Sequence, residues 1–310
     1  MIITVTLNAA VDKTVVIHNF SINQVNKIDC VRYDPGGKGI NVSKTIKNLG
    51  GTSLAIGLVG GHTGEYIEDT LKDCGISTSF TRVSQETRTN TKIIDPSNQS
   101  ITEINERGLE IEPNIYVSIL EKLVNLVLPN DIVVFAGSVP IGCSYEMIGK
   151  CIRTCRQKGA LIFLDASDEI LEQAIREKPF LIKPNLSEFE TLIGHELTTM
   201  QEMVLEAKKL VKQGISIVAL SLGAEGALFV SQHSVIRAQP LKVTVRSTVG
   251  AGDAVMAALA YAFDTGLPWI DTIKLACASG AAKVSCNGTQ AASIDNISSL
   301  IDRVELQIIE

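Results

Sequence analysis

Short apolar runs rich in Val, Ile and Phe alternate along this chain with longer stretches of helical periodicity. Several of the runs are apolar at nearly every position, as strands covered by helices on both faces must be. We expect such strands over residues 2–7, 53–59, 131–136, 160–165, 180–183 and 215–221. Because parallel strands need crossover helices between them, the alternation predicts an α/β fold with a mostly parallel central sheet.

The stretches between these strands carry their apolar residues at helical spacing. Residues 144–158 place them on one face, which predicts an amphipathic helix. A second helix is expected to begin near Asn41 and to end before Gly50-Gly51, a plausible C-cap. Helices of this kind are the crossovers that the parallel sheet requires.

The composition limits the class of protein. With 310 residues, 45% of them hydrophobic, the chain is long enough for one large domain over residues 1–310. A domain of this size buries roughly 75% of its unfolded surface. The 28 Lys and Arg against 34 Asp and Glu give a net charge of −6, which argues against non-specific nucleic-acid binding. We therefore expect no nucleic-acid partner.

Membrane and export signals are also missing from the sequence. No apolar run approaches the ~20 residues that span a bilayer, and no basic region precedes an apolar one at the start, so we expect no membrane association. The seven cysteines form no Cys-x-x-Cys pair. Reduced thiols in a cytoplasmic protein are the expectation.

Two polar segments, about 13–34 and 88–107, interrupt the alternation. The first has two extended pieces around residues 21–26, and the second is a predicted hairpin because Asp95-Pro96-Ser97-Asn98 is a strong turn sequence. Both are too polar and short for central strands, so we expect a small β-sheet that projects from the main domain. An apolar face on such a sheet would need a cover, either substrate or a second subunit.

The strongest local signal is Ser247-Thr248-Val249-Gly250-Ala251-Gly252-Asp253, which precedes a helical pattern over 254–263. Small residues at a helix start leave several backbone N–H groups pointing at one spot, where the helix dipole adds partial positive charge. Such a nest suits the charge on a transferring phosphoryl group. The alternative is that Asp253 only stabilises the helix dipole, but two glycines around Ala251 favour close approach of a ligand.

A second glycine cluster, Gly36-Gly37-Lys38-Gly39-Ile40-Asn41, leads into a helix. Its glycines permit close backbone approach, and the amide of Asn41, with a donor and an acceptor, suits a sugar hydroxyl. An ordinary flexible loop is the alternative. The cluster is not a P-loop, because no Gly-x-x-x-x-Gly-Lys-Ser/Thr occurs in the chain.

Two further segments close predicted strands, where ligands of open α/β sheets bind. In 183–188, Lys183 suits a phosphate, and Asn185 and Glu188 suit hydrated Mg²⁺. A helix with a capping box is the alternative for this segment. The segment 221–226 either approaches a nucleotide with its backbone or forms a plain tight turn.

Three cations, Lys27, Arg88 and Arg107, lie in or beside the projecting sheet. They indicate an anionic substrate, with solvated surface charge as the alternative for each. No histidine pairs with another His or Cys at metal-ligand spacing. Neither Gly-x-Ser-x-Gly nor, after the first strand, Gly-x-Gly-x-x-Gly occurs. These absences disfavour a zinc enzyme, a hydrolase and a dinucleotide oxidoreductase.

In order and spacing, these segments resemble the ribokinase-like pfkB family of carbohydrate kinases, from residue 4 to about 285. The matching segments are Thr6-Leu7-Asn8 with Asp12, 36–41, Thr87-Arg88-Thr89-Asn90, Gly137-Ser138-Val139-Pro140, 183–188, 221–226 and 250–253. The most similar branch is that of the 1-phosphofructokinases and tagatose-6-phosphate kinases. The resemblance implies a three-layer ribokinase-like α/β sandwich with a small β-sheet lid that often serves as dimer contact, so a homodimer through the lid is expected.

The resemblance also implies roles for individual residues. Asp253 is expected to be the base that takes the proton of the acceptor hydroxyl, and the N–H groups of Gly250, Ala251 and Gly252 to form the anion hole. The residues expected at ATP are Lys183, Asn185, Ser221, Gly223, Gly226 and Gly252. Those expected at Mg²⁺, through water, are Asn185 and Glu188. Those expected at the sugar phosphate are Asp12, Lys27, Gly37, Lys38, Asn41, Arg88, Arg107, Ser138 and Asp253.

The implied reaction is ATP- and Mg²⁺-dependent phosphorylation of a ketohexose phosphate, with conversion of fructose 1-phosphate to fructose 1,6-bisphosphate favoured. Tagatose 6-phosphate is the alternative acceptor. A non-catalytic sugar- or nucleotide-binding sensor on the same fold is the alternative class, and the presence of Asp253 weighs against it. An exposed Asp, with a pKa of about 3.9, is a weak base toward an alcohol, so the lid is expected to exclude water.

Overall fold

The computed structural model describes residues 1–166, 168–286 and 290–310. Within them, the main sheet has ten strands in the order β14-β13-β12-β11-β10-β9-β8-β1-β4-β5. Its strands are β1 (Ile2–Thr6), β4 (Ser53–Gly60), β5 (Ser77–Val83), β8 (Ile132–Ala136), β9 (Leu161–Asp165), β10 (Leu181–Ile182), β11 (Ile217–Ser221), β12 (Ala227–Ser231), β13 (Val235–Ala238) and β14 (Leu306–Ile308). From β5 to β11 every neighbouring pair is parallel, and β12 to β14 continue the sheet antiparallel. The mostly parallel α/β sheet that the sequence predicted is confirmed.

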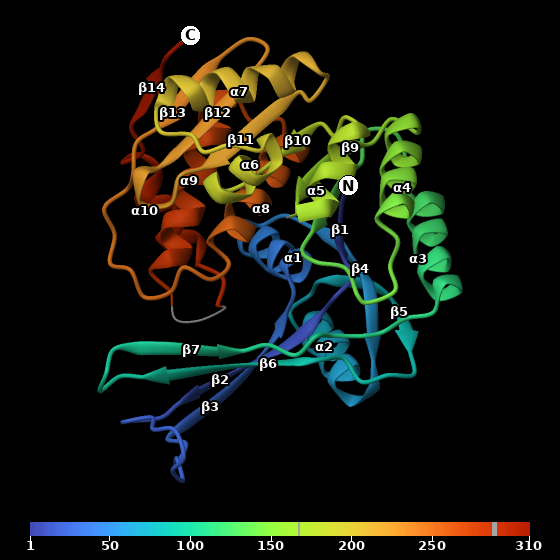
Figure 1. The fold of residues 1–310 in the computed structure, drawn as a ribbon, viewed down its shortest axis with the longest axis vertical. Coiled ribbons are helices and arrows are strands. Elements are labelled where there is room, and N and C mark those ends of the chain that lie inside the picture. Colours follow the sequence, from blue (N-terminus) through green and yellow to red (C-terminus); the bar gives the residue numbers. More distant parts are fainter. Residues whose placement is uncertain (167, 287–289) are drawn as a thin grey trace.

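Helices cover both faces of this sheet (Figure 1). They are α1 (Lys38–Asn48), α2 (Gly61–Asp73), α3 (Pro113–Leu126), α4 (Tyr145–Gln157), α5 (Asp168–Arg176), α6 (Leu186–Ile193), α7 (Met200–Lys212), α8 (Ala251–Thr265), α9 (Trp269–Val284) and α10 (Ile294–Ile301). A hydrophobic core lies on each face of the main sheet. On β8, for example, Val133 and Phe135 pack in the core with α3 to α7, whereas Ile132 and Val134 pack in the core with α1 and α8 to α10. The protein therefore has three layers, α/β/α.

The helix boundaries follow the sequence closely, with one difference. Helix α4 occupies the predicted stretch 144–158. Helix α1 begins at Lys38, three residues before the predicted start at Asn41, because Gly37 has a φ of 112° outside the helical range and the helical turn begins directly after it. The early start places Lys38 and Asn41 on the same first turn of α1.

A second, four-stranded sheet, called the lid sheet here, projects from the main domain at the bottom of Figure 1. Its order is β3-β2-β6-β7, built from β2 (Ala10–Val16), β3 (Cys30–Gly36), β6 (Thr89–Asp95) and β7 (Ser100–Ile104). The first pair of strands starts before residue 13 and ends after residue 34, so it is longer than the predicted segment. The parallel pairing of β2 with β6 joins the two segments.

The tip of the lid sheet is fixed by one carboxylate. Asp95 accepts hydrogen bonds from the backbone N–H groups of Asn19 (3.0 Å), Phe20 (2.8 Å) and Ser97 (3.0 Å). The predicted turn after Asp95 is thus tied to the loop between β2 and β3.

Among the described residues, none of the helices has the length and apolarity to cross a bilayer.

Candidate active site

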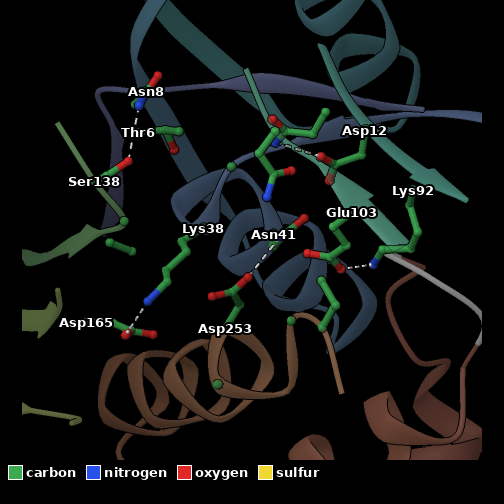
Figure 2. A pocket seen from close by; sticks show the side chains of 18 of the residues that line it. Thr6, Asn8, Asp12, Lys38, Asn41, Lys92, Glu103, Ser138, Asp165 and Asp253 are labelled. Carbon is green, nitrogen blue, oxygen red and sulfur yellow. Dashed lines mark hydrogen bonds and ion pairs between the residues drawn. The ribbon is translucent and has the colours of Figure 1, made fainter. Parts of the chain in front are cut away.

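The lid sheet meets the main domain at a cavity of about 520 Å³, within the usual range for small-molecule sites (Figure 2). The carboxyl ends of β9, β10 and β11 and the N-termini of α1 and α8 form one side of it, as expected for an open α/β sheet. Its lining residues include Thr6, Asn8, Asp12, Gly37, Lys38, Asn41, Arg88, Asn90, Lys92, Glu103, Ser138, Asp165, Lys183, Asn185, Glu188, Ser221, Gly250, Gly252 and Asp253. The cavity is therefore strongly polar and carries both signs of charge.

Helix α8 begins at the floor of the cavity. Gly250 is its N-cap with a φ of 78°, a left-handed conformation that favours glycine. The N–H group of Ala251 donates to the carbonyl oxygen of Thr248 at 3.3 Å, whereas the N–H groups of Gly252 and Asp253 have no acceptor within the described chain. We call these free N–H groups and the Gly250 turn the α8 nest. It offers an anion the partial positive charge of a helix N-terminus.

Asp253 lies in the first turn of α8 and is 5% exposed. Its Oδ2 accepts a hydrogen bond from Nδ2 of Asn41 at 2.9 Å, which joins α8 to α1 (Figure 2). Burial, together with the charge of Asp165, raises the pKa of Asp253 to about 6, against the hydrogen bond from Asn41. A carboxylate with this pKa is a better proton acceptor than an exposed one and is still ionised at neutral pH.

A second buried carboxylate, Asp165, ends strand β9 and binds two lysines. Its Oδ1 lies 3.1 Å from Nζ of Lys38, and its Oδ2 lies 3.2 Å from Nζ of Lys183. Although burial opposes it, the charges of Lys183 and Lys38 hold the pKa of Asp165 below its ordinary value. Asp165 thereby fixes two ammonium groups at the cavity edge, where both remain available to a phosphate.

The segment after β10 forms the capping box that was the simpler alternative for this sequence. Oδ1 of Asn185 accepts from the N–H of Glu188, and Oε2 of Glu188 accepts from the N–H of Asn185, both at 2.9 Å. Both side chains nevertheless line the cavity. The capping box holds them in place and leaves Oε1 of Glu188 without a role in it.

The turn after β11 is fixed to the segment after β10. The N–H of Ser221 donates to the carbonyl oxygen of Pro184 at 3.0 Å, which joins the two strand ends. Residues 223–225 form a single 3₁₀ turn before β12. Of this predicted nucleotide segment, Ser221 lines the cavity and Gly223 and Gly226 lie outside its lining.

The lid sheet covers the cavity with alternating polar side chains. In the parallel pairing of β2 with β6, Asp12 lies beside Asn90 and Thr14 beside Lys92. Nδ2 of Asn90 donates to Oδ1 of Asp12 at 3.3 Å, and burial raises the pKa of this carboxyl. Lys92, 9% exposed, forms an ion pair with Glu103 on β7 at 3.1 Å (Figure 2).

Residues beside β1 and β8 complete the cavity wall. Nδ2 of Asn8 donates to Oγ of Ser138 at 3.1 Å, and the guanidinium of Arg88 donates to the carbonyl oxygen of Asn8 at 3.2 Å. Gly37 is required here because a Cβ at this position would lie 2.6 Å from Cγ2 of Thr6. The start of α1 can therefore lie against β1 and still face the cavity.

Several buried polar atoms of the cavity have no hydrogen-bond partner within the described chain. They are Thr6 Oγ1, Asn8 Oδ1, Asn41 Oδ1, Arg88 Nε and Asn90 Oδ1. Buried polar groups are normally paired, so this concentration indicates a ligand with several hydroxyl or phosphate oxygens. The two sites expected from the sequence, a sugar near Asn41 and an anion at α8, thus share one cavity.

Two predicted cations stay outside the cavity of this chain. Lys27 lies exposed in the loop between β2 and β3, and Arg107 lies exposed after β7. Ala251 also lies outside the lining, and its N–H donates to the carbonyl oxygen of Thr248, so this N–H group is not free for the predicted anion hole. The remaining predicted residues, other than Gly223 and Gly226, are brought together in the lining.

Sequence reasoning missed three charged residues of the site: Asp165, Lys92 and Glu103. Asp165 was predicted to end a strand, and the rule that parallel strand ends gather at one edge would have assigned it to the cavity, as it did Lys183. Lys92 lies two residues after Asn90 on β6, so strand alternation places both on one face. Glu103 had no such signal, because its position follows from hairpin register.

Comparison with known proteins identifies the family of this chain. The profile of the pfkB family of carbohydrate kinases matches residues 5–296. A 1-phosphofructokinase of Haemophilus influenzae is 33% identical over 310 residues, which covers 100% of this chain and 99% of that relative. A 1-phosphofructokinase of Bacillus subtilis is 38% identical over 282 residues, covering 91% of this chain and 92% of that relative.

Solved structures show the same relationship. Phosphofructokinase-2 of Escherichia coli in complex with substrates and products has a TM-score of 0.93 and 27% identity, and the alignment covers 97% of this chain and 98% of that chain. The family resemblance and the ribokinase-like fold expected from the sequence are therefore confirmed. The chain belongs to the pfkB family of carbohydrate kinases.

Proposed function

We propose that this protein is a 1-phosphofructokinase, which transfers the γ-phosphoryl group of ATP to fructose 1-phosphate and yields fructose 1,6-bisphosphate and ADP. The relatives that are 32–38% identical over most of the chain carry this name. The main observation behind the proposal is the position of Asp253, a buried carboxylate with a raised pKa at the α8 nest. The same cavity contains buried polar atoms without a partner in the described chain, which a sugar could pair with.

The α8 nest and the carboxylate of Asp253 have different roles in the proposed reaction. As the acceptor oxygen bonds to the γ-phosphorus, the bond from that phosphorus to the β–γ bridging oxygen breaks and ADP leaves. Asp253 takes the hydroxyl proton, and the N–H groups of Gly252 and Asp253 face the negative charge of the transferring group. Phosphoryl transfer asks mainly for positioning and charge stabilisation, which these groups supply.

Cations at the cavity edge would bind the phosphates of ATP. Lys183, 5% exposed, is held by Asp165 beside Gly252, since its Nζ is 2.9 Å from the position that a Cβ of Gly252 would take. We assign Lys183 to the ATP phosphates. Ser221, with the turn through Gly223 and Gly226 behind it, would border the rest of the nucleotide.

Asn185 and Glu188 fit a magnesium ion bound through water. Within the described residues no group of three or more His, Cys, Asp or Glu side chains is placed to hold a metal. Mg²⁺ does not need one, because it keeps several waters and takes one or two carboxylates plus substrate phosphates. The capping box already fixes the carboxylate of Glu188 at the cavity. When bound, Mg²⁺ would neutralise charge on the phosphates.

The sugar phosphate would lie between the main domain and the lid sheet. Asp12, Asn41 and Ser138 offer hydrogen-bond partners for its hydroxyl groups, with Gly37 and Lys38 beside them. Arg88, whose Nε has no partner within the described chain, would bind its existing phosphate. A lid closed over this group would exclude water from the reaction, because a bound sugar fills the space between the sheets.

A homodimer through the lid sheet would cover its exposed apolar residues. Val31 and Tyr33 on β3 are 46% and 47% exposed, and Ile104 on β7 is 56% exposed. Surface of this kind is uncommon on a small projecting sheet of a monomer. A second copy would also bring its own Lys27 and Arg107 to the lid, which is our reason to keep both as substrate-binding candidates.

The cysteine chemistry fits a reducing compartment. All seven cysteines belong to the described chain, and all are free thiols. We infer a cytoplasmic location, where free thiols are the ordinary state.

The experiment that tests the proposed function is an ATP-consumption assay over fructose 1-phosphate, tagatose 6-phosphate, fructose 6-phosphate and free sugars. Fructose 1-phosphate is expected to give the highest kcat/KM, with fructose 1,6-bisphosphate identified as product by ³¹P NMR. A higher kcat/KM for tagatose 6-phosphate would make the protein a tagatose-6-phosphate kinase. No ATP consumption with any of these compounds would refute the proposal.

A further inference from the structure

An ion pair between Lys92 and Glu103 occupies the inner face of the lid sheet. The two residues lie opposite each other in the antiparallel pairing of β6 with β7, and Nζ of Lys92 is 3.1 Å from Oε1 of Glu103. Both side chains line the cavity, and both point into it in Figure 2. The ion pair therefore lies in the space that a substrate would enter.

The two members of this ion pair differ in how easily they can part. The side chain of Lys92 is 11% exposed, whereas that of Glu103 is 43% exposed and belongs to β7 at the edge of the lid sheet. A half-exposed carboxylate can leave an ion pair at little cost, because water solvates it. A buried ammonium cannot, because it would remain without a counter-charge. Lys92 thus needs an anion, but that anion does not have to be Glu103.

Lys92 belongs to a row of polar side chains on β6 and the residue before it. Arg88, Asn90 and Lys92 occupy alternate positions, so they share the face of the lid sheet that lines the cavity. Nε of Arg88 and Oδ1 of Asn90 are buried without a hydrogen-bond partner in the described chain. The ammonium of Lys92 has three N–H donors, and one carboxylate does not use them all. The row therefore has donors to spare for a ligand.

The charges around the cavity make this row the place for an anionic group of the sugar. Lys38 and Lys183 are held by Asp165 on the main domain, so Arg88 and Lys92 are the lining cations on the lid side of the described chain. An uncharged sugar would leave the ion pair of Lys92 intact. A phosphate would attract the ammonium of Lys92 and repel the carboxylate beside it, because like charges at this distance oppose each other.

We propose that Lys92 is a specificity-determining residue that binds the phosphate group of the sugar phosphate, and that Glu103 is its partner only while the site is empty. On binding, the phosphate takes the place of the Glu103 carboxylate, which turns toward solvent at the edge of the lid sheet. Arg88 would hold the same phosphate from the other side of Asn90. The proposal rests on the proposed function, because it explains the preference of that site for a phosphorylated sugar.

Two variants with opposite expected effects test this exchange. Lys92→Met should raise KM for fructose 1-phosphate at least about 10-fold and leave KM for ATP within about 2-fold, because a charged hydrogen bond to the phosphate is lost. Glu103→Gln should lower KM for fructose 1-phosphate at least about 3-fold, because the phosphate no longer displaces a carboxylate. Lys72→Met, which breaks an exposed ion pair with Asp69 on α2, is the matched control and should change neither KM.

Binding without turnover separates the exchange from a structural role. In titration calorimetry without nucleotide, fructose 1-phosphate should bind at least about 10-fold more weakly to Lys92→Met and at least about 3-fold more tightly to Glu103→Gln than to the wild type. If the ion pair only stabilised the lid sheet, both variants would bind more weakly, because both break it. Thermal unfolding shows whether each variant is folded, and Glu103→Gln changes a half-exposed side chain that the fold tolerates.

Weaker binding in both variants would overturn the inference, as would unchanged binding in Lys92→Met or a rise in KM for ATP in place of KM for the sugar. Failure of the wild type to bind either fructose 1-phosphate or tagatose 6-phosphate would also overturn it. If the wild type binds fructose 1-phosphate but phosphorylates no sugar, the proposed function fails, and the two opposite changes in affinity still support the role of Lys92.

Discussion

The raised pKa of Asp253 implies that this carboxylate destabilises the fold at neutral pH. Its pKa rises from an ordinary value of 3.8 to about 6, so the folded chain keeps the proton up to a higher pH than the unfolded chain does. The free energy of unfolding is therefore lowered as the pH rises through this interval. Asp253→Asn, which is neutral at every pH, should remove the penalty, because an amide oxygen can still accept the hydrogen bond from Asn41.

The size of the effect follows from the two pKa values. The stabilisation by Asp253→Asn should be about 3 kcal/mol at pH 8 and less than about 1 kcal/mol at pH 4, where the folded carboxyl is already protonated. For 310 residues, an unfolding entropy of about 2.1 cal/mol/K per residue converts the value at pH 8 to a rise in Tm of roughly 4–5 °C. Differential scanning calorimetry at the two pH values measures both numbers.

Asp165→Asn is the matched control, and it should act in the opposite direction. Lys183 and Lys38 hold the pKa of Asp165 below its ordinary value, against burial, so its charge stabilises the fold above pH 3.8. The loss of that charge removes the ion-pair partner of the buried Lys183 and of the partly exposed Lys38. We expect Asp165→Asn to lower stability by about 3–5 kcal/mol at pH 7. An Asp253→Asn variant that is less stable than the wild type at pH 8 would refute the reasoning.

Three further predictions concern activity and fold. The wild-type kcat/KM for the sugar should fall about 10-fold from pH 7 to pH 5, since Asp253 with a pKa of about 6 is protonated at the lower pH, and a flat profile over this range would contradict the assignment. Arg88→Ala should raise KM for the sugar phosphate at least about 10-fold with little change in KM for ATP; the reverse pattern would mean that Arg88 serves the nucleotide. Gly37→Ala should destabilise the protein by about 1–3 kcal/mol, because a Cβ would lie 2.6 Å from Thr6 at a φ of 112°, and an unchanged Tm would show that the loop relaxes freely.

The features that the sequence predicted best are those with a local cause. The two-sided apolar runs require helices on both faces, and the observed parallel pairs from β5 to β11 follow from that requirement. The glycines at 250 and 252 and Asp253 lie on adjacent residues, so the helix start that gathers them could be read without tertiary information. The capping box of Asn185 and Glu188 is local in the same way.

Contacts between residues that are far apart in the sequence could not be predicted from local patterns. The ion pair of Asp165 with Lys38 joins residues 127 positions apart, and the hydrogen bond from Asn41 to Asp253 spans 212 positions. No local pattern indicates which lysine meets which carboxylate. Strand alternation places Lys92 on the same face as Asn90, but nothing in the sequence showed that Lys27 lies at the far end of the lid sheet, away from the cavity.

The most direct test of the account is the turnover of Asp253→Asn with ATP and fructose 1-phosphate at pH 7. If Asp253 accepts the proton of the sugar hydroxyl at the α8 nest, kcat should fall at least about 100-fold while ATP affinity stays within about 3-fold of the wild type. Turnover close to that of the wild type would contradict the role of Asp253.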